Sequence, residues 1–265
     1  MVEAGRGDLW SAGDAYELYV GRWSRRVARE FLGWLGLPPG GDWIDVGCGT
    51  GTLAQAILEE CGPISVAAAD TSPGFLQHAR RQTGDLRVMF VQADAEALPC
   101  AGRSFDAAVS GLVLNFVGRP LRAVREMRRV VRPGGTVAAY VWDYAEGMQM
   151  MRRFWDAAIE ADPAAAALDE GVRFPLCSPA RLASLFSDAG LARVETRVIG
   201  IPTVFSDFDD FWRPFLGGQG PAPGYCMGLA PERREALREQ LHAALPVRAD
   251  GTIPLEARAF AVRGR

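Results

Sequence analysis

Three glycines at alternate positions, Gly47, Gly49 and Gly51, follow an apolar run that ends at Asp45. Glycine tolerates a positive φ and leaves space where a side chain would stand, so such a turn brings backbone N–H groups close to a bound molecule. The residues from Thr52 onward have a helical pattern, and a helix N-terminus carries unpaired donors and partial positive charge. This combination predicts a cofactor-binding turn between a buried strand and a helix.

Two further aspartates follow later apolar runs. Asp70 ends the run 64–69 and stands 19 positions after Gly51 (70 − 51), where a carboxylate can accept hydrogen bonds from both hydroxyls of a ribose. Asp94 follows the run 88–93 in the same way. Parallel strands end at one edge of a sheet, so these acids are expected to gather beyond that edge. The alternatives are structural: a cap beside Ser72 for Asp70, and a turn for Asp94.

The spacing Asp-x-Gly-x-Gly-x-Gly differs from the G-x-G-x-x-G of dinucleotide-binding turns. It resembles motif I of the class I S-adenosylmethionine (SAM)-dependent methyltransferases of the small-molecule type (methyltransferase type 11-like). The resemblance covers most of 43–143 with motifs in order, and 179–201 loosely. It implies an α/β fold with a doubly wound, Rossmann-like sheet, mostly parallel with an antiparallel last strand, plus a helical cap or insertion, and SAM as cofactor.

The resemblance also assigns roles to residues. The acid of motif I orients water or the amino group of the methionine part, the second acid binds the ribose, and the Asp-Ala pair after the third strand meets the adenine. The implied cofactor-binding residues are Tyr16, Arg22, Asp45, Gly47, Cys48, Gly49, Gly51, Asp70, Thr71, Asp94, Ala95 and Ser110. The residues expected to face the methyl acceptor are Tyr19, Trp23, Asn115 and Trp142.

Several of these residues have a second interpretation. Arg22 could be a solvated charge, and its aromatic neighbours could pack on the edge of the sheet. The sequence shows no well-placed general base; Asp143 and Tyr144 are the candidates, and Asp143 could instead cap the helix that follows it. His78 has polar neighbours in its helix and is expected to be solvated.

Composition excludes several other classes of enzyme. All 29 basic residues are arginine, and a chain without lysine cannot use a pyridoxal-phosphate Schiff base, a Walker A loop or a Tyr-x-x-x-Lys pair. The two histidines lie far apart and the five cysteines have no C-x-x-C spacing, so no metal site is predicted. The net charge of −3 argues against nucleic acid as a partner. With no signal peptide and no membrane-length apolar run, a cytoplasmic protein is expected.

The chain of 265 residues is predicted to form a single methyltransferase domain. Residues 1–41 would be an N-terminal cap, 42–143 the SAM-binding core, and 144–265 a C-terminal half. In that half, an insertion at 202–252 precedes the last strand, expected at 255–262. The insertion is rich in aromatic residues, so it could serve as a lid or substrate wall, or as a helical decoration.

The function predicted from these features is transfer of a methyl group from SAM to a small-molecule acceptor, mainly by proximity and orientation. Two alternatives stay open: an RNA or protein methyltransferase, and a SAM-binding protein without catalysis. The first is disfavoured because the fourth strand ends in Ser110-Gly111-Leu112 and not in the Asn/Asp-Pro-Pro-Tyr/Phe signature of many amino-directed enzymes. The acceptor, the methylated atom and the oligomeric state are not predicted.

Overall fold

The computed structural model describes residues 17–218 and 220–265, and these separate into two compact units. The sheet unit holds Ser24–Trp142, Leu176–Ile199 and Ala259–Arg265. The helical unit holds 17–23, Asp143–Pro175 and 200–258 without 219. Each unit is described by itself below. The organisation of 1–265 as one domain stays a prediction.

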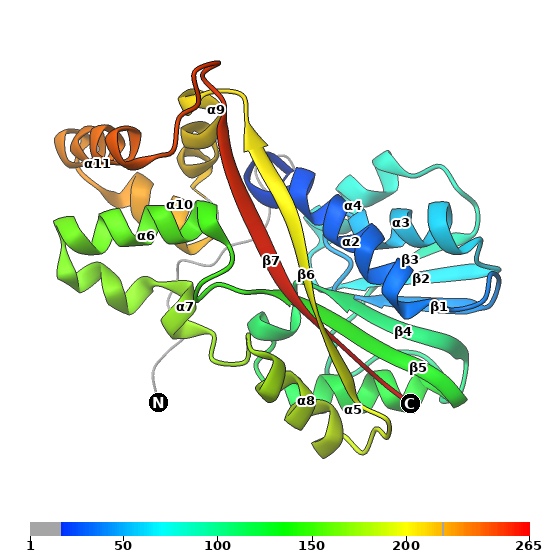
Figure 1. The fold of residues 1–265 in the computed structure, drawn as a ribbon. Coiled ribbons are helices and arrows are strands. Elements are labelled where there is room, and N and C mark those ends of the chain that lie inside the picture. Colours follow the sequence, from blue (N-terminus) through cyan, green and yellow to red (C-terminus); the bar gives the residue numbers. More distant parts are fainter. Residues whose placement is uncertain (1–16, 219) are drawn as a thin grey trace. The chain divides into compact units, whose positions relative to one another are not determined.

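A seven-stranded sheet carries the fold, in the order β3-β2-β1-β4-β5-β7-β6 (Figure 1). Strands β1 to β5 pair in parallel, and β7 pairs antiparallel with β5. The strands are β1 (Asp42–Val46), β2 (Ser65–Asp70), β3 (Val88–Gln92), β4 (Phe105–Gly111), β5 (Val131–Trp142), β6 (Glu195–Phe205) and β7 (Ile253–Gly264). The predicted doubly wound sheet with an antiparallel last strand is therefore confirmed.

Helices cover both faces of the sheet unit (Figure 1). One face carries α2 (Arg22–Leu35), α3 (Thr52–Cys61) and α4 (Pro73–Gln82), and the other carries α5 (Pro120–Val130) and α8 (Pro179–Asp188). Their apolar residues recur at helical spacing, which places a stripe of side chains against the strands. In α5 that stripe is fully buried and consists of Ala123, Val124, Met127 and Val130. His78 of α4 is also buried, so the expectation that it is solvated was wrong.

The segment Arg132-Pro133-Gly134-Gly135 lies inside β5. The pairing with β4 jumps from Val131 opposite Phe105 to Thr136 opposite Ala107, which makes this segment a bulge. A Cβ on Gly135 would lie 2.6 Å from the backbone oxygen of Asp106, so only glycine fits there.

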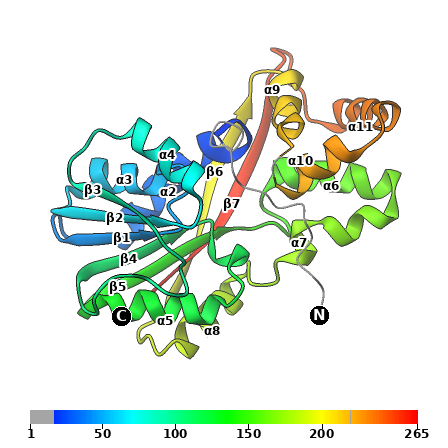
Figure 2. The same cartoon turned by 180° about the vertical axis from the view of Figure 1, so that it is seen from behind.

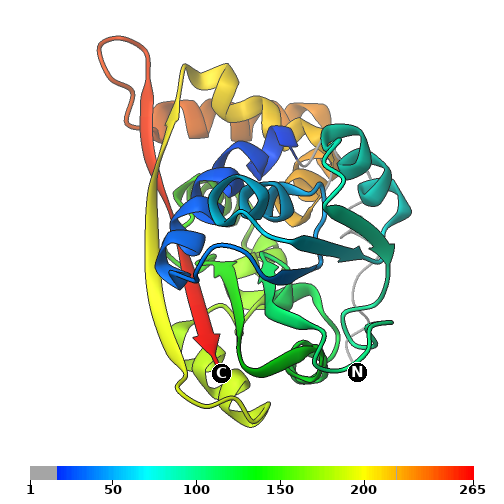
Figure 3. The same ribbon diagram turned by 90° about the vertical axis from the view of Figure 1, so that its right-hand side faces the viewer.

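Strands β6 and β7 are neighbours in the sheet, and β7 is longer than predicted (Figure 3). The last strand was expected at 255–262 and spans Ile253–Gly264. Because β6 extends to Phe205, the connection between the two strands begins at 206 and not at 202.

The helices of the helical unit are labelled in Figure 2, and its core is built around aromatic side chains. Its helices are α6 (Gln149–Ala161), α7 (Glu170–Arg173), α9 (Phe208–Trp212), α10 (Pro221–Gly228) and α11 (Pro231–Ala244). Phe215, from the turn after α9, stacks on Phe154 of α6 with ring centroids 4.4 Å apart. Both rings are fully buried, and the burial of each such side chain contributes about 1.5–3 kcal/mol to folding.

Candidate functional site

The glycine turn joins β1 to α3 in the sheet unit, and all three of its glycines have a positive φ: 77° at Gly47, 53° at Gly49 and 90° at Gly51. The backbone N–H of Gly47 donates to the carbonyl of Ala69 at 2.7 Å, which ties the turn to the end of β2. Gly51 precedes α3 without a side-chain cap, so the helix presents its first N–H groups without a side-chain acceptor from that position. The predicted strand–turn–helix is confirmed.

Two of these glycines are required for different physical reasons. A Cβ on Gly47 would lie 2.5 Å from the side chain of Val113, which follows β4 and fills that space. A Cβ on Gly49 would have no atom within 4 Å. Gly47 thus permits close packing inside the protein, whereas Gly49 borders open space on the ligand side of the turn.

Asp70, at the end of β2, is already hydrogen-bonded to the turn. Its Oδ2 accepts from the N–H of Gly49 at 2.9 Å, and its Oδ1 accepts from the N–H of Ser72 at 2.8 Å. Burial raises the pKa of this carboxyl group, and the N–H groups of Ser72, Gly49 and Thr71 lower it. A carboxylate offers about four acceptor sites, so two remain for the hydroxyls of a ribose.

Asp45 in β1 is completely buried, and neither of its carboxylate oxygens has a hydrogen-bond partner of ordinary geometry among the described residues. Burial and the neighbouring charge of Asp70 raise its pKa to about 8, while the backbone N–H of Ala54 acts in the opposite direction. Buried polar groups without partners are rare in native proteins. Asp45 is therefore a candidate to accept a hydrogen bond from a ligand.

Asn115, shortly after β4, is the second such group in the sheet unit. Both polar atoms of its side-chain amide are buried and have no partner among the described residues. Leu112, three residues earlier, has a φ of 63°, a conformation rare for a bulky side chain. Such strain is typical of segments that position functional groups.

Other predicted cofactor residues have structural partners. The Ser110 hydroxyl donates to the carbonyl of Val46 at 2.8 Å, which joins β4 to β1. Asp94 caps a turn, since its Oδ1 accepts from the N–H of Glu96 at 2.9 Å. Thr71 is exposed, and Cys48 is buried in the glycine turn. The roles of these residues and of Ala95 in cofactor binding stay predictions.

The charge of this site fits one class of ligand. Two acidic residues, Asp45 and Asp70, lie beside the glycine turn, and the charge of Asp70 acts on Asp45. The Asp70 carboxylate would repel the pyrophosphate of a dinucleotide, and Asp45, protonated in the free protein, would ionise beside a ligand that carries an ammonium group. An adenosine with a cationic amino-acid tail therefore fits the cradle better than a dinucleotide does.

Comparison with known proteins agrees with this geometry. Residues 44–139 match the family profile described as a methyltransferase domain. A demethylmenaquinone methyltransferase of Renibacterium salmoninarum is 38% identical over 112 residues, which are 42% of this chain and 46% of that protein. A malonyl-[acyl-carrier protein] O-methyltransferase of Hahella chejuensis is 30% identical over 46% of this chain and 48% of its own length.

Residues 44–139 are a class I SAM-dependent methyltransferase domain. Proteins with this domain use SAM as the methyl donor. The chain spans about half the length of the curated relatives it matches.

Solved structures extend the likeness of fold beyond this segment. A Bacillus halodurans protein described as a candidate methyltransferase has a TM-score of 0.59 at 18% identity, and covers 90% of this chain and 97% of its own. The phosphoethanolamine N-methyltransferase 2 of Haemonchus contortus, solved with SAM, has a TM-score of 0.58 at 17% identity over 96% of this chain and 56% of its own. At these identities the comparison shows the Rossmann-like methyltransferase fold.

In the helical unit, Arg22 has a protein partner. Its Nη1 contacts both carboxylate oxygens of Asp210, at 2.9 and 3.1 Å. Its guanidinium lies 4.3 Å from the ring centroid of Trp23 and 4.8 Å from that of Phe205. Arg22 is thus not a free solvated charge; its Nε and Nη2 are buried without a hydrogen-bond partner among the described residues, and its contact with SAM stays a prediction. Tyr16 lies outside the described residues.

The predicted acceptor-facing aromatics are buried. Tyr19 contacts Phe215 edge-on at 5.8 Å in the helical unit, and Trp23 contacts Phe205 at 5.4 Å. Trp142 ends β5 in the sheet unit and is also buried. Their contact with an acceptor stays a prediction.

Of the two candidates for a general base, Asp143 has a structural role. It is buried, its Oδ2 pairs with the guanidinium of Arg258, and its Oδ1 accepts from the N–H of Glu146 at 3.1 Å. Tyr144 is buried against Phe174 at 5.5 Å. Asp143 thus caps a turn before α6, and the alternative that it caps the helix itself was wrong, because α6 begins at Gln149 with Met148 as its N-cap.

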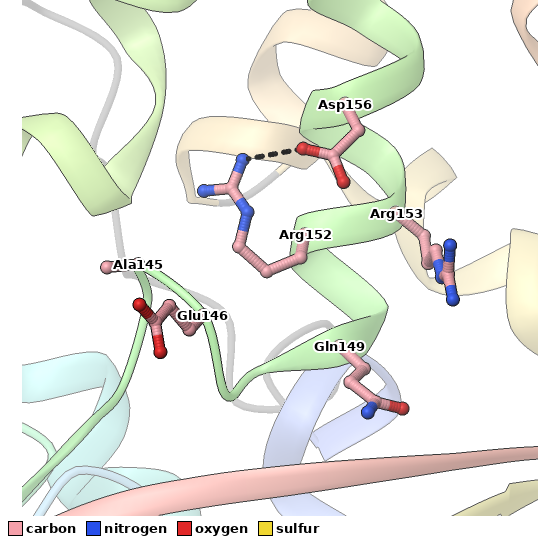
Figure 4. A pocket seen from close by; sticks show the side chains of 6 residues that line it. All are labelled: Ala145, Glu146, Gln149, Arg152, Arg153 and Asp156. Atoms are coloured by element: carbon pink, nitrogen blue, oxygen red, sulfur yellow. Dashed lines mark hydrogen bonds and ion pairs between the residues drawn. The ribbon is translucent and has the colours of Figure 1, made fainter.

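The helical unit also has a surface pocket of about 320 Å³ (Figure 4). Its lining residues are Ala145, Glu146, Gln149, Arg152, Arg153 and Asp156. Several of its polar groups are engaged: Arg152 pairs with Asp156 at 3.3 Å, and Gln149 accepts from the N–H of Glu256 at 2.9 Å. The pocket therefore carries no assignment.

Sequence reasoning missed one polar group of the helical unit. Glu170 is 1% exposed and follows an alanine-rich stretch. The only signal in the sequence was the acidic pair Asp169-Glu170, which usually means a solvated helix start.

Within residues 17–218 and 220–265, no cluster of three or more His, Cys, Asp or Glu could hold a metal ion. None of the helices in these ranges is long and apolar enough to cross a membrane.

Proposed function

We propose that the whole protein transfers a methyl group from SAM to a small-molecule acceptor. The observation that carries this proposal is the glycine turn with two carboxylates, in which Asp45 is buried without a partner and Gly49 borders open space. The two curated relatives described above support it, because one is named for demethylmenaquinone and the other for a malonyl group on acyl-carrier protein.

SAM fits the polar groups that the sheet unit leaves available, and when bound it supplies a methyl group made electrophilic by the sulfonium. Asp45 would accept from the ammonium group of the methionine part, directly or through water. Asp70 would accept from the ribose hydroxyls with the acceptor sites not used by Gly49 and Ser72.

The chain's main contribution is alignment. A near-linear arrangement of nucleophile, methyl carbon and leaving sulfur is what raises the rate, and well-oriented reactants gain about 7–11 kcal/mol from proximity. The side-chain amide of Asn115 has no hydrogen-bond partner among the described residues. It can position the methyl acceptor, since it offers both a donor and an acceptor.

Calorimetric titration with S-adenosylhomocysteine and, separately, with NAD(H) tests the cofactor. Micromolar binding of the first and no binding of the second is expected. Labelled SAM and a panel of small acceptors, with bulk RNA and denatured protein as further acceptors, then test the reaction. Label on RNA or protein alone would favour an RNA or protein methyltransferase. Binding of S-adenosylhomocysteine without any methyl transfer would favour a non-catalytic SAM-binding protein. The cytoplasmic location stays a prediction.

A further inference from the structure

The helical unit contains a buried carboxylate. Glu170, the first residue of α7, is 1% exposed, and its Oε2 accepts a hydrogen bond from the indole N–H of Trp155. Arg152 pairs with the adjacent Asp169, and Arg173 acts on Glu170 through its charge. Carboxylates are almost never fully buried unless paired, because desolvation of an uncompensated charge costs several kcal/mol.

A phenol in the same unit is unsatisfied. The side chain of Tyr19 is 2% exposed, and its hydroxyl has no hydrogen-bond partner among the described residues. Burial raises the pKa of Tyr19 well above its usual value, and the charges of Glu170 and then Tyr144 raise it further. The Tyr19 hydroxyl therefore lies within the electrostatic field of the Glu170 carboxylate without being bonded to it.

An ion pair of the preceding residue, Asp169, holds the start of α7 in place. Nη1 of Arg152 contacts both oxygens of the Asp169 carboxylate, at 2.8 and 2.9 Å, and also donates to the carbonyl of Tyr144 at 3.2 Å. Asp169 in turn accepts from the N–H of Gly171 at 2.8 Å. Arg152, which appears in Figure 4, thus fixes the start of α7 against the Tyr144 backbone while neutralising Asp169 rather than Glu170.

Aromatic rings connect these two polar groups. Tyr19 contacts Phe215, Phe215 stacks on Phe154, and Phe154 contacts Trp155 edge-on at 5.4 Å. Trp155 then donates to Glu170. The Tyr19 phenol and the Glu170 carboxylate are thus linked by a series of aromatic rings, whose faces carry partial negative charge.

We propose that Glu170 and Tyr19 recognise a protonated amine on the methyl acceptor, with the surrounding rings holding its apolar part. This inference rests on the proposed function for the role of the amine-bearing molecule as methyl acceptor; the ammonium group held by Glu170 is not the methylated atom, because it has no lone pair. The site is named the amine site below, and it consists of Tyr19, Trp155 and Glu170.

A cation is the ligand that satisfies these groups best. An ammonium group has three donors, so it can bond to the carboxylate and the phenol at once, and aromatic faces attract it further. A carboxylate or phosphate ligand would be repelled by Glu170. Burial raises the pKa of Glu170 to about 7, while its own backbone N–H, the Trp155 hydrogen bond and the charge of Arg173 act in the opposite direction. Ionisation near neutral pH therefore requires little additional stabilisation from an incoming cation.

Matched probes can isolate the contribution of the positive charge. 2-Phenylethylamine and 2-phenylethanol have the same shape and differ in the ammonium group, and phenylacetate carries the opposite charge. Calorimetric titration of the full chain with each probe, in the presence of S-adenosylhomocysteine, should show at least tenfold tighter binding of the amine than of the alcohol. Phenylacetate should bind more weakly than either.

Two variants test the residues. Glu170→Gln keeps an acceptor for Trp155 but removes the charge, and should bring the amine and the alcohol to within about twofold of each other. Tyr19→Phe should weaken the amine and leave the alcohol less affected. Glu239→Gln, an exposed glutamate of the same unit, is the control and should keep the wild-type preference.

The outcomes separate this inference from the proposed function. If S-adenosylhomocysteine binds but no amine binds, or if Glu170→Gln keeps the preference with circular dichroism unchanged, the amine site is wrong and the two groups bond only to water. Failure of S-adenosylhomocysteine to bind would overturn the proposed function instead.

Discussion

The backbone N–H of Gly49 donates to Oδ2 of Asp70 at 2.9 Å, and so joins the turn after β1 to the end of β2. This bond gives one carboxylate two roles in the methyltransferase domain. It satisfies a backbone donor of the glycine turn, and it keeps further acceptor sites for a ligand. Removal of the carboxylate should therefore affect both stability and cofactor binding.

Asp70→Ala should weaken the binding of S-adenosylhomocysteine at least tenfold, because charged hydrogen bonds contribute about 1.5–3 kcal/mol each. It should also lower the free energy of unfolding by about 1–3 kcal/mol, since the N–H groups of Gly49 and Ser72 lose their acceptor. Calorimetry and urea unfolding measure the two effects. Asp188→Ala, at an exposed aspartate of the sheet unit, is the control and should change neither. Unchanged affinity in a folded Asp70→Ala protein would remove Asp70 from the cofactor site.

Gly47 and Gly49 should respond differently to substitution. Gly47→Ala introduces a Cβ 2.5 Å from Val113 at a φ of 77°, so it should cost about 2–4 kcal/mol of stability. Gly49→Ala adds strain alone and should cost about 1–2 kcal/mol. Chemical unfolding compares the two.

Two further variants separate the causes. Gly47→Ala combined with Val113→Ala should be less destabilised than the sum of the two single changes, because the clash is relieved. Simple additivity would contradict that packing relationship. Gly49→Val should leave a folded protein that no longer binds S-adenosylhomocysteine, since its side chain occupies the open space above the turn.

Asp45 should make stability fall as pH rises. Its pKa is about 8 in the native state and about 3.9 in the unfolded chain, so between these values the native protein holds a proton that the unfolded chain has lost. The stabilisation is complete below about pH 4 and is lost progressively up to about pH 8, at about 1.4 kcal/mol per pH unit. The difference in unfolding free energy between wild type and Asp45→Asn should follow this slope from pH 5 to pH 8. Parallel curves for the two proteins would show that Asp45 is ionised throughout.

Cofactor binding should release a proton from the same group. An ammonium ion beside Asp45 lowers the pKa of that carboxyl group, so at pH 7 the bound state holds fewer protons than the free protein. Titration with S-adenosylhomocysteine in phosphate and in Tris should then give different binding enthalpies, because these buffers differ in ionisation enthalpy. The dependence on buffer should disappear in Asp45→Asn. The same dependence in both proteins would place the ammonium elsewhere.

Arg258→Ala should destabilise the helical unit by about 2–3 kcal/mol, because Asp143 is 2% exposed and would remain as a buried charge without its partner. Thermal unfolding measures this loss. Asp143→Asn should be milder, since the half-exposed guanidinium of Arg258 can turn to water and no buried charge is left unpaired. If Asp143 is structural, methyl transfer by the folded Asp143→Asn protein should be retained. Loss of transfer with unchanged binding of S-adenosylhomocysteine would instead favour Asp143 as the general base.

The sequence by itself determined the strand–turn–helix around Gly47, Gly49 and Gly51, the position of Asp70 after the second strand, and the mostly parallel sheet. These features are local: they depend on glycine at positive φ, on apolar runs of strand length and on the helical stripes between them. The absence of lysine, a property of composition alone, also excludes whole classes of chemistry whatever the fold.

Only the tertiary structure decided which polar groups are already engaged. Ser110 bonds to Val46, Arg22 pairs with Asp210 from 188 positions away, and Asp143 pairs with Arg258. It also decided which groups have no hydrogen-bond partner of ordinary geometry within 17–218 and 220–265, as is the case for Asp45, Asn115 and the hydroxyl of Tyr19. No local pattern encodes these outcomes, because hydrogen-bond partners far apart in the chain are chosen by packing, and packing also determines which carboxylates lose their water.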